Sequence, residues 1–160
     1  EILGQFDVLL VFDPPADRDQ NVGLGDVDVA FFSLDDLEAI HAELCARVEA
    51  AGGRIDAIAY CPHLPTEDCD CRKPRTGLLR AIEAELGEQA AGAWFIGDSL
   101  KDLQAARAFG CRPALVTTGK GVGTAAQLAG PEPGLEDPTA IPVFANLAEA
   151  INTLLELAPA

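Results

Sequence analysis

The sequence predicts a three-layer α/β fold, in which a parallel β-sheet carries helices on both faces. Between residues 33 and 157, short apolar runs alternate with stretches whose apolar residues recur at helical spacing. Glycines follow several of the helical stretches, and glycine commonly ends a helix. Strand–helix alternation of this kind implies parallel strands joined by helical crossovers. In such sheets a ligand binds beyond the carboxyl ends of the strands.

The first part of the chain contains two expected strands and one expected helix. Residues 7–12 and residues 55–60 are short apolar runs, which are typical of buried strands. Ser33 is a suitable N-cap for the helix between them, and Gly52-Gly53 ends that helix. The apolar stripe of the helix consists of Leu34, Leu37, Leu44 and Val48.

The remaining elements follow in the same alternating order. A second helical stripe consists of Leu78, Leu79, Ile82 and Leu86, and Gly87 ends it. The later expected elements are strands at 93–96, 114–116 and 142–144, a helix at 100–109, a glycine-rich stretch at 119–123, a loop at 130–142, and a final helix that Asn146 caps and that runs to Leu157.

Composition limits the class of protein. At 160 residues, 49% of them apolar, the chain is expected to form one domain spanning residues 1–160. The 26 acidic residues against 11 basic ones argue against a nucleic-acid partner, because phosphate-backbone binding depends on Lys and Arg. No apolar run approaches the roughly 18 residues of a membrane helix, and no signal-peptide pattern opens the sequence. We therefore expect a cytoplasmic monomer with no membrane partner.

Residues 61–71 hold three cysteines and one histidine in the pattern C-x-H-x5-C-x-C. Three thiolates and one imidazole form a set that tetrahedral Zn²⁺ takes in structural sites. If Zn²⁺ binds all of Cys61, His63, Cys69 and Cys71, no position is left for a reacting water, so the zinc is expected to be structural. Arg72, Lys73 and Arg75 follow directly. The metal would thus hold a rigid loop that offers cations to an anion.

Other interpretations of the cysteines are open. Disulfides would leave His63 without a role, and Cys69 and Cys71 are too close in sequence for either to bridge elsewhere without strain. The clustering could also reflect cysteines acting as small apolar side chains. The flanking Pro, Thr, Glu and Asp indicate a polar loop, which favours the metal. The odd total of five cysteines suits a reducing compartment, and Cys45 and Cys111 are expected to fill the core.

Polar residues follow three expected strands at the points where they end. After the strand at 93–96 come Asp98 and Asp102, four residues apart at a helix start, so both carboxylates can face one side. Carboxylates at a strand end suit Mg²⁺, which completes its coordination with water and phosphate. Asp98 could instead cap the helix. Lys73, after a neighbouring strand, favours a metal and phosphate site, and residues 117–120 follow the next strand.

These segments resemble the haloacid dehalogenase (HAD) superfamily. The resemblance rests on residues 60–63 and 69–77, on Gly-Asp-Ser-Leu-Lys-Asp at 97–102, and on Thr-Gly-Lys-Gly at 118–121. Within the superfamily, residues 31–157 are similar to the zinc-containing D-glycero-D-manno-heptose-1,7-bisphosphate 7-phosphatases and their histidinol-phosphatase relatives. The resemblance implies a Rossmann-like HAD fold with structural zinc and catalytic Mg²⁺.

The resemblance also implies roles for individual residues. Lys73 would offset charge on the phosphoryl group. Asp98 would bind Mg²⁺, with Asp102 supporting that site. Arg72 and Ser99 would contact the phosphate or the sugar of the substrate.

Family members carry Asp-x-Asp-Gly at the end of their first strand. The first Asp is phosphorylated, and the second acts as acid and then as base. Asp17-Arg18-Asp19-Gln20 resembles this motif, with Gln20 in place of glycine, so Asp17 and Asp19 are the expected catalytic residues and further Mg²⁺ ligands. The strand at 7–12 ends early for that motif, and too few residues separate Asp19 from Phe31 for a helix and a strand.

Two alternatives for residues 1–30 are open. Residues 6–12 could be the second strand of the family, with 20–25 in place of its Thr-Asn-Gln-Ser-Gly segment, and the nucleophile would then be absent. Alternatively, Asp17 and Asp19 form a solvated acidic turn after Pro14-Pro15. We expect this region to be an altered or truncated form of the start of the family's domain.

Three functional hypotheses follow. The first is a Mg²⁺-dependent phosphatase that acts on a sugar phosphate through an aspartyl-phosphate. The family implies heptose bisphosphate as its substrate, and lipopolysaccharide or S-layer sugar assembly as its context. The second is a catalytically silent, zinc-folded domain that binds a phosphosugar or a partner protein. The third is a phosphatase of histidinol phosphate.

Overall fold

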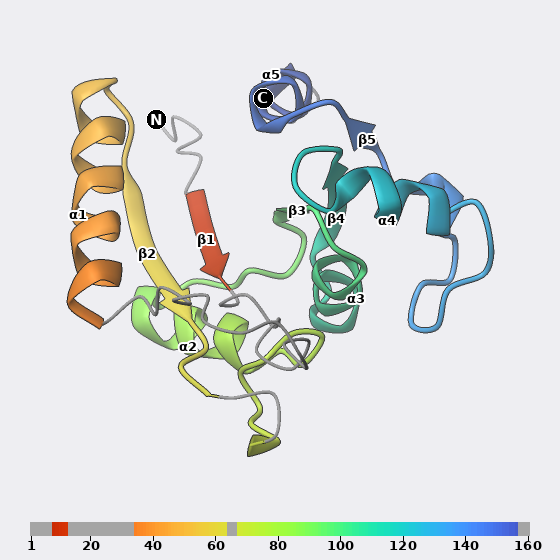
Figure 1. The fold of residues 1–160 in the computed structure, drawn as a ribbon, viewed down its shortest axis with the longest axis horizontal. Coiled ribbons are helices and arrows are strands. Elements are labelled where there is room, and N and C mark those ends of the chain that lie inside the picture. Colours follow the sequence, from red (N-terminus) through yellow and green to blue (C-terminus); the bar gives the residue numbers. More distant parts are fainter. Residues whose placement is uncertain (1–7, 13–33, 64–66, 157–160) are drawn as a thin grey trace, which may run out of the picture. The chain divides into compact units, whose positions relative to one another are not determined.

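The computed structural model of the chain describes residues 8–12, 34–63 and 67–156, and the statements below concern these residues (Figure 1). Their contacts divide the chain into two compact units, Glu1–Asp68 and Cys69–Ala160. One unit contains a two-stranded sheet and the other a three-stranded sheet. Every strand pair in both sheets is parallel, as the alternation of strands and helices predicts.

The first unit consists of β1 (Val8–Phe12), α1 (Leu34–Ala50) and β2 (Ile55–Tyr60). β1 pairs with β2 along its length, and Phe12 lies opposite Tyr60. Gly52 has a φ of +83°, and the amide of Gly53 donates to the Val48 carbonyl at 2.9 Å, so this glycine pair ends α1 as expected. The expected cap, Ser33, lies outside the described residues. β2 ends directly before Cys61, the first cysteine of the candidate metal loop.

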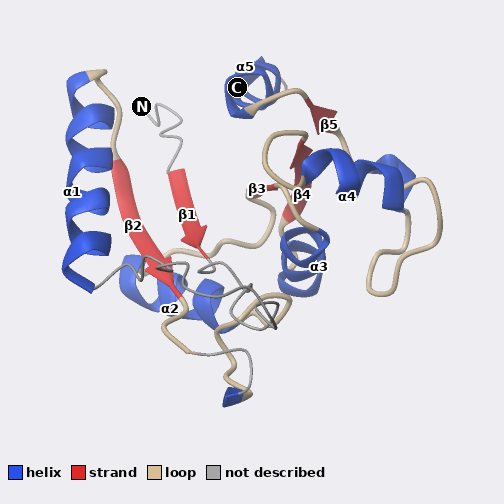
Figure 2. Cartoon of the chain, viewed as in Figure 1, coloured by secondary structure: helices blue, strands red, loops and turns tan. Residues whose placement is uncertain are grey.

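The second unit continues the alternation of helices and strands (Figure 2). Its helices and strands are α2 (Gly77–Leu86), β3 (Trp94–Gly97), α3 (Leu100–Phe109), β4 (Arg112–Val116), α4 (Gly121–Gln127), a short 3-10 helix (Pro138–Ala140), β5 (Val143–Phe144) and α5 (Leu147–Glu156). β4 is the central strand and pairs with β3 and β5.

The core of the second unit lies on both faces of β4. Leu115 belongs to a buried cluster with Leu103 of α3 and with residues of the 128–141 segment. Ala114 and Val116 belong to another cluster, with Phe144 of β5 and Ala150 and Leu154 of α5. Because neighbouring residues of a strand point to opposite faces, these two clusters cover the two sides of the sheet. The three-layer arrangement is therefore confirmed in this unit.

Helix ends agree with the sequence patterns in detail. Leu78, Leu79 and Ile82 are buried along α2, which Gly87 ends with a φ of +70°. The Asn146 side chain accepts a hydrogen bond from the Glu149 amide at 3.0 Å and caps α5. In the described ranges, no helix combines the length and the apolar character that crossing a bilayer requires.

Two short elements were not expected from the sequence: the 3-10 helix (Pro138–Ala140), which lies within the expected loop at 130–142, and α4. Residues 119–123 indicate only a glycine-rich stretch, but α4 begins at Gly121. The strands differ from expectation only at their ends, because β3 begins one residue later than predicted and β4 two residues earlier. These differences leave the carboxyl ends of β3 and β4 side by side, with Gly97 opposite Leu115.

Candidate functional site

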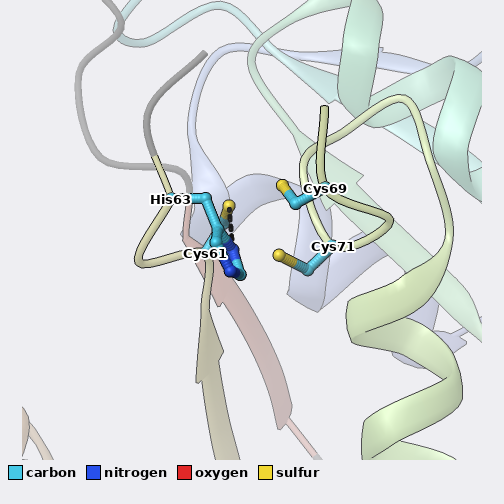
Figure 3. Close-up of side chains that lie close together, drawn as sticks. All are labelled: Cys61, His63, Cys69 and Cys71. Atoms are coloured by element: carbon cyan, nitrogen blue, oxygen red, sulfur yellow. Dashed lines mark hydrogen bonds between the residues drawn. The ribbon is translucent and has the colours of Figure 1, made fainter. Parts of the chain in front are cut away.

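The sulfur and nitrogen atoms of Cys61, His63, Cys69 and Cys71 gather at one point of the chain (Figure 3). One ligand atom from each residue lies within 4.8 Å of all the others. A tetrahedral ion with bonds of about 2.0–2.3 Å holds its ligands about 3.3–3.8 Å apart, so the cluster needs only a small contraction to bind one. The Sγ of Cys61 and the Nδ1 of His63 already lie 3.8 Å apart. The four residues that the sequence predicts as zinc ligands thus lie together, and their donor set is compatible with zinc.

The chain after the last cysteine forms a tight turn. The Gly77 amide donates to the Asp70 carbonyl at 2.9 Å, and the Arg75 guanidinium donates to the Cys69 carbonyl at 2.7 Å. A Cβ at Gly77 would approach the Asp70 carbonyl oxygen to 2.4 Å, so only glycine fits there. These contacts fix the backbone on both sides of Lys73. Arg75, one of the cations that follow the cysteines, binds the loop itself.

Lys73 and Asp102 form a buried ion pair. The Nζ of Lys73 lies 2.6 Å from Oδ1 of Asp102, and the two residues are 8% and 5% exposed. The other oxygen of Asp102, Oδ2, accepts hydrogen bonds from the amide of Ser99 at 3.0 Å and from its hydroxyl at 2.7 Å. Both carboxylate oxygens of Asp102 therefore have partners within the protein.

Ser99 and Asp102 together cap α3. Ser99 is the N-cap, and its hydroxyl also accepts from the Asp102 amide at 3.4 Å, which completes a capping box. A Cβ at Gly97 would lie 2.3 Å from the Cβ of Asp102, so a residue without a side chain is required at the end of β3. In this geometry Asp102 orients Lys73 and the helix start. That agrees with a supporting role, which the resemblance implies for it.

Asp98 lies at the carboxyl end of β3 and contacts the segment that follows β4. Its Oδ2 accepts a hydrogen bond from the Lys120 amide at 2.9 Å, and its main-chain carbonyl accepts one from the Thr124 hydroxyl at 2.9 Å. Since Ser99 caps α3, Asp98 is not the N-cap, and the alternative interpretation of Asp98 is wrong. Within the described part of the chain, Oδ1 of Asp98 makes no hydrogen bond or ion pair, so this oxygen is available to a cation.

The other predicted residues differ in what the structure says of them. Arg72, which directly precedes Lys73 in the sequence, is partly buried. Cys111 is buried as expected, and its thiol donates to the Ala90 carbonyl at 3.2 Å, while Cys45 is only partly buried. Burial, and secondarily the nearby Glu83 carboxylate, raise the pKa of the Cys111 thiol. Asp17 and Asp19 lie outside the described residues.

Three contacts of this site were not predicted from the sequence. The first is the pairing of Lys73 with Asp102, which are far apart in the sequence and carry no local signal of contact. The other two are the hydrogen bonds to Asp98 from the Lys120 amide and from the Thr124 hydroxyl. The capping box was readable, because Ser99 stands three residues before Asp102.

A family model and similar named proteins indicate the same family for this chain. Residues 70–150 match the HAD-hydrolase-like family model. The chain is 44% identical over 126 residues to a protein of Pseudomonas aeruginosa named D-glycero-β-D-manno-heptose-1,7-bisphosphate 7-phosphatase, a match that covers 79% of this chain and 66% of that protein. It is 46% identical over 125 residues to the Pseudomonas putida protein of the same name, covering 78% of this chain and 67% of that protein.

A solved structure agrees with these relatives. The crystal structure of D,D-heptose 1,7-bisphosphate phosphatase from Bordetella bronchiseptica, complexed with magnesium and phosphate, superposes with a TM-score of 0.74. That match is 35% identical and covers 95% of this chain and 75% of the other. The chain spans about two thirds of the length of its Pseudomonas relatives. It belongs to the HAD-hydrolase-like family, alongside the proteins named heptose-1,7-bisphosphate 7-phosphatases.

Proposed function

We propose that this chain is a Mg²⁺-dependent phosphatase that removes the 7-phosphate of D-glycero-D-manno-heptose 1,7-bisphosphate. The observation that carries the proposal is the buried ion pair of Lys73 and Asp102 at the start of α3, next to Asp98 at the end of β3. The names of the relatives indicate the substrate.

Lys73 suits the binding of a phosphoryl group. Its ammonium group is a positive charge with three N–H donors, and its contact with Asp102 at 2.6 Å fixes its position. A buried ion pair is a weak source of stability, because removing both charges from water costs about as much as their attraction returns. Its presence at this strand end is better explained by chemistry: a fixed cation in a water-poor setting stabilises the negative charge of a phosphoryl group in transfer.

Asp98 suits a Mg²⁺ ion. Mg²⁺ usually takes one or two carboxylates from the protein and completes its octahedron with water and phosphate oxygens. The Lys120 amide fixes one oxygen of Asp98, and Oδ1 makes no hydrogen bond or ion pair within the described residues. When bound, the ion would polarise the phosphoryl oxygens and offset their charge. Magnesium and phosphate in the Bordetella structure support this proposal.

Asp17 and Asp19 are the proposed nucleophile and acid–base residue, and further Mg²⁺ ligands. The Asp17 carboxylate would attack phosphorus and break the bond to the C7 oxygen, while Asp19 donates a proton to that leaving oxygen. Asp19 would then take a proton from water, which hydrolyses the aspartyl-phosphate and releases inorganic phosphate. Arg72 and Ser99 would contact the phosphate or the sugar.

The zinc is proposed to be structural. Cys61, His63, Cys69 and Cys71 would saturate a tetrahedral ion, so no reacting group could join it. The ion would hold the loop whose next residues are Arg72 and Lys73. The sugar phosphate would reach this loop from the cytoplasm, where reducing conditions disfavour disulfides, and none of the five cysteines forms a disulfide in the structure. We propose that the protein acts as a monomer, in the assembly of lipopolysaccharide sugars.

Phosphate release tests the proposal. The chain is incubated with heptose 1,7-bisphosphate, other sugar phosphates and histidinol phosphate, each with Mg²⁺ and with EDTA. We expect Mg²⁺-dependent release that is fastest from the heptose bisphosphate. Fastest release from histidinol phosphate would assign the chain to the other branch, and no release from any substrate would reject phosphatase activity.

A catalytically silent phosphosugar-binding domain is the second candidate. The observation that favours it is Gln20, which stands where the Asp-x-Asp-Gly motif has glycine. Beryllofluoride with Mg²⁺ mimics the phosphate on an aspartate, so mass spectrometry or fluorine NMR can detect an adduct on Asp17. An adduct supports the enzyme. Sugar phosphate binding without an adduct supports the silent domain.

A further inference from the structure

Thr124 is a buried polar residue without a role in the proposed chemistry. It lies in α4 and is 5% exposed. Its hydroxyl lies 2.9 Å from the main-chain carbonyl oxygen of Asp98 and 3.4 Å from the carbonyl oxygen of Lys120. A hydroxyl has one proton to donate, and the shorter distance favours Asp98 as its acceptor. The hydroxyl therefore links α4 to the end of β3 rather than closing a turn of its own helix.

This link acts on the residue that carries the proposed Mg²⁺ ligand. Asp98 is held to the β4–α4 segment twice, by its carbonyl at Thr124 and by its carboxylate at the Lys120 amide. The two bonds attach opposite ends of the same residue. Together they restrict rotation of its peptide group and of its side chain, which sets the direction of Oδ1.

The backbone around this link is closely packed. A Cβ at Gly121 would lie 1.8 Å from the Val116 carbonyl oxygen and 3.8 Å from that of Asp98. A Cβ at Gly119 would lie 2.1 Å from Oδ2 of Asp98. The first turn of α4 thus lies directly against the strand end, and small movements of α4 would reach the Asp98 carboxylate.

We propose that Thr124 is a positioning residue for the divalent cation site, and that its hydroxyl acts by orienting Asp98. This inference rests on the proposed function, because it takes Asp98 to be a metal ligand. Partners behind a metal ligand commonly change metal affinity about 10- to 100-fold when they are lost. Loss of the Thr124 hydroxyl is therefore expected to weaken cation binding while the fold persists.

Mn²⁺ titration of the full chain tests this inference without relying on turnover. Free Mn²⁺ is measured by electron paramagnetic resonance, and urea unfolding is followed in the same samples. Thr124→Val removes the hydroxyl and keeps the shape of the side chain, whereas Thr124→Ser keeps the hydroxyl. Thr139→Val is the matched control, because Thr139 is exposed and its hydroxyl bonds, among the described residues, only to the nearby Asp137 carboxylate, at 2.7 Å.

We expect Thr124→Val to raise the Kd for Mn²⁺ about 10-fold or more, and Thr124→Ser and Thr139→Val to bind as the parent chain does. Equal Mn²⁺ affinity in Thr124→Val and the parent would overturn this inference and leave the proposed function standing. No Mn²⁺ binding by the parent would overturn both. If Thr124→Val does not fold, the Kd for Mn²⁺ is compared between Thr124→Ser, which keeps a hydroxyl, and Thr124→Ala, which lacks one. Equal Kd values for these two variants would also reject the role of the hydroxyl.

Discussion

The ammonium of Lys73 lies 2.6 Å from the carboxylate of Asp102, and less than a tenth of each residue is exposed to solvent. This contact joins the chain that leaves the cysteine cluster to the first turn of α3. Asp102 is in turn fixed by two hydrogen bonds from Ser99. The position of the proposed catalytic cation thus depends on a helix cap.

Replacement of Lys73 by methionine is expected to affect both activity and stability. The variant leaves the buried Asp102 carboxylate without its cation, and breaking a buried pair in this way costs about 3–5 kcal/mol. It also removes the charge proposed to stabilise the phosphoryl group, so turnover should fall by several orders of magnitude. Urea unfolding and phosphate release measure the two effects.

The double variant Lys73→Met/Asp102→Leu separates these effects. With both charges gone, most of the lost stability should return, because an apolar pair of similar size can replace a buried ion pair. Turnover should stay low. Recovery of turnover together with stability would show that the pair serves the fold alone.

Loss of one cysteine of the cluster should release the zinc. In Cys69→Ser the proposed tetrahedral site loses a thiolate, so we expect less than stoichiometric zinc by elemental analysis and a lower melting temperature. Cys45→Ser is the control, since Cys45 lies in α1 outside the cluster. Full zinc content and an unchanged melting temperature in Cys69→Ser would reject the assignment.

Gly119 and Gly123 form a matched pair for testing the Asp98 site. Gly119 has a φ of +56°, and a Cβ there would lie 2.1 Å from the Asp98 carboxylate, whereas a Cβ at Gly123 would meet nothing within 4 Å. Gly119→Ala should displace the carboxylate and lower Mg²⁺-dependent turnover, and the left-handed backbone adds about 1–2 kcal/mol of destabilisation. Gly123→Ala should preserve turnover and should raise the free energy of unfolding by up to about 1 kcal/mol, because alanine favours a helix more than glycine does. Equal turnover in the two variants would contradict the role of Asp98.

The Cys111 thiol predicts a dependence of stability on alkaline pH. Burial and Glu83 raise its pKa in the folded chain above the value of about 8.5 expected when unfolded. The contribution of the Cys111 thiol to the free energy of unfolding is therefore complete below about pH 8.5. It is lost as the pH rises toward the pKa of the folded chain, because in that range the thiol ionises only in the unfolded chain. Urea midpoints between pH 7.5 and 10 should fall less steeply in Cys111→Ala than in the parent. An equal fall of the urea midpoint with pH in Cys111→Ala and in the parent would contradict this prediction.

Local patterns of the sequence predicted most elements of the second unit. The apolar stripe of Leu78, Leu79 and Ile82 becomes the buried face of α2, and Asn146 caps α5 as its residue type suggests. These features depend on residues a few positions apart, which a sequence displays directly.

Features that depend on distant contacts were not predictable in this way. α4 contains two glycines in its first three residues, a poor helix signal, and its start packs against Val116 and Asp98. The partner of Lys73 was equally hidden, because Asp102 reads locally as a helix-start acid. The resemblance to a known family suggested the proposed roles of Lys73 and Asp98, and the structure shows the contacts that hold these two residues.

Phosphorus NMR of heptose 1,7-bisphosphate, during incubation with the chain and Mg²⁺, tests the proposed hydrolysis of a sugar phosphate at the site of Lys73 and Asp98. The spectrum reports which phosphate leaves. We expect the 7-phosphate signal to be replaced by inorganic phosphate while the 1-phosphate persists, and no change with the Lys73→Met/Asp102→Leu variant. Two unchanged phosphate signals with the parent chain, or loss of the 1-phosphate instead, would reject the proposed 7-phosphatase activity.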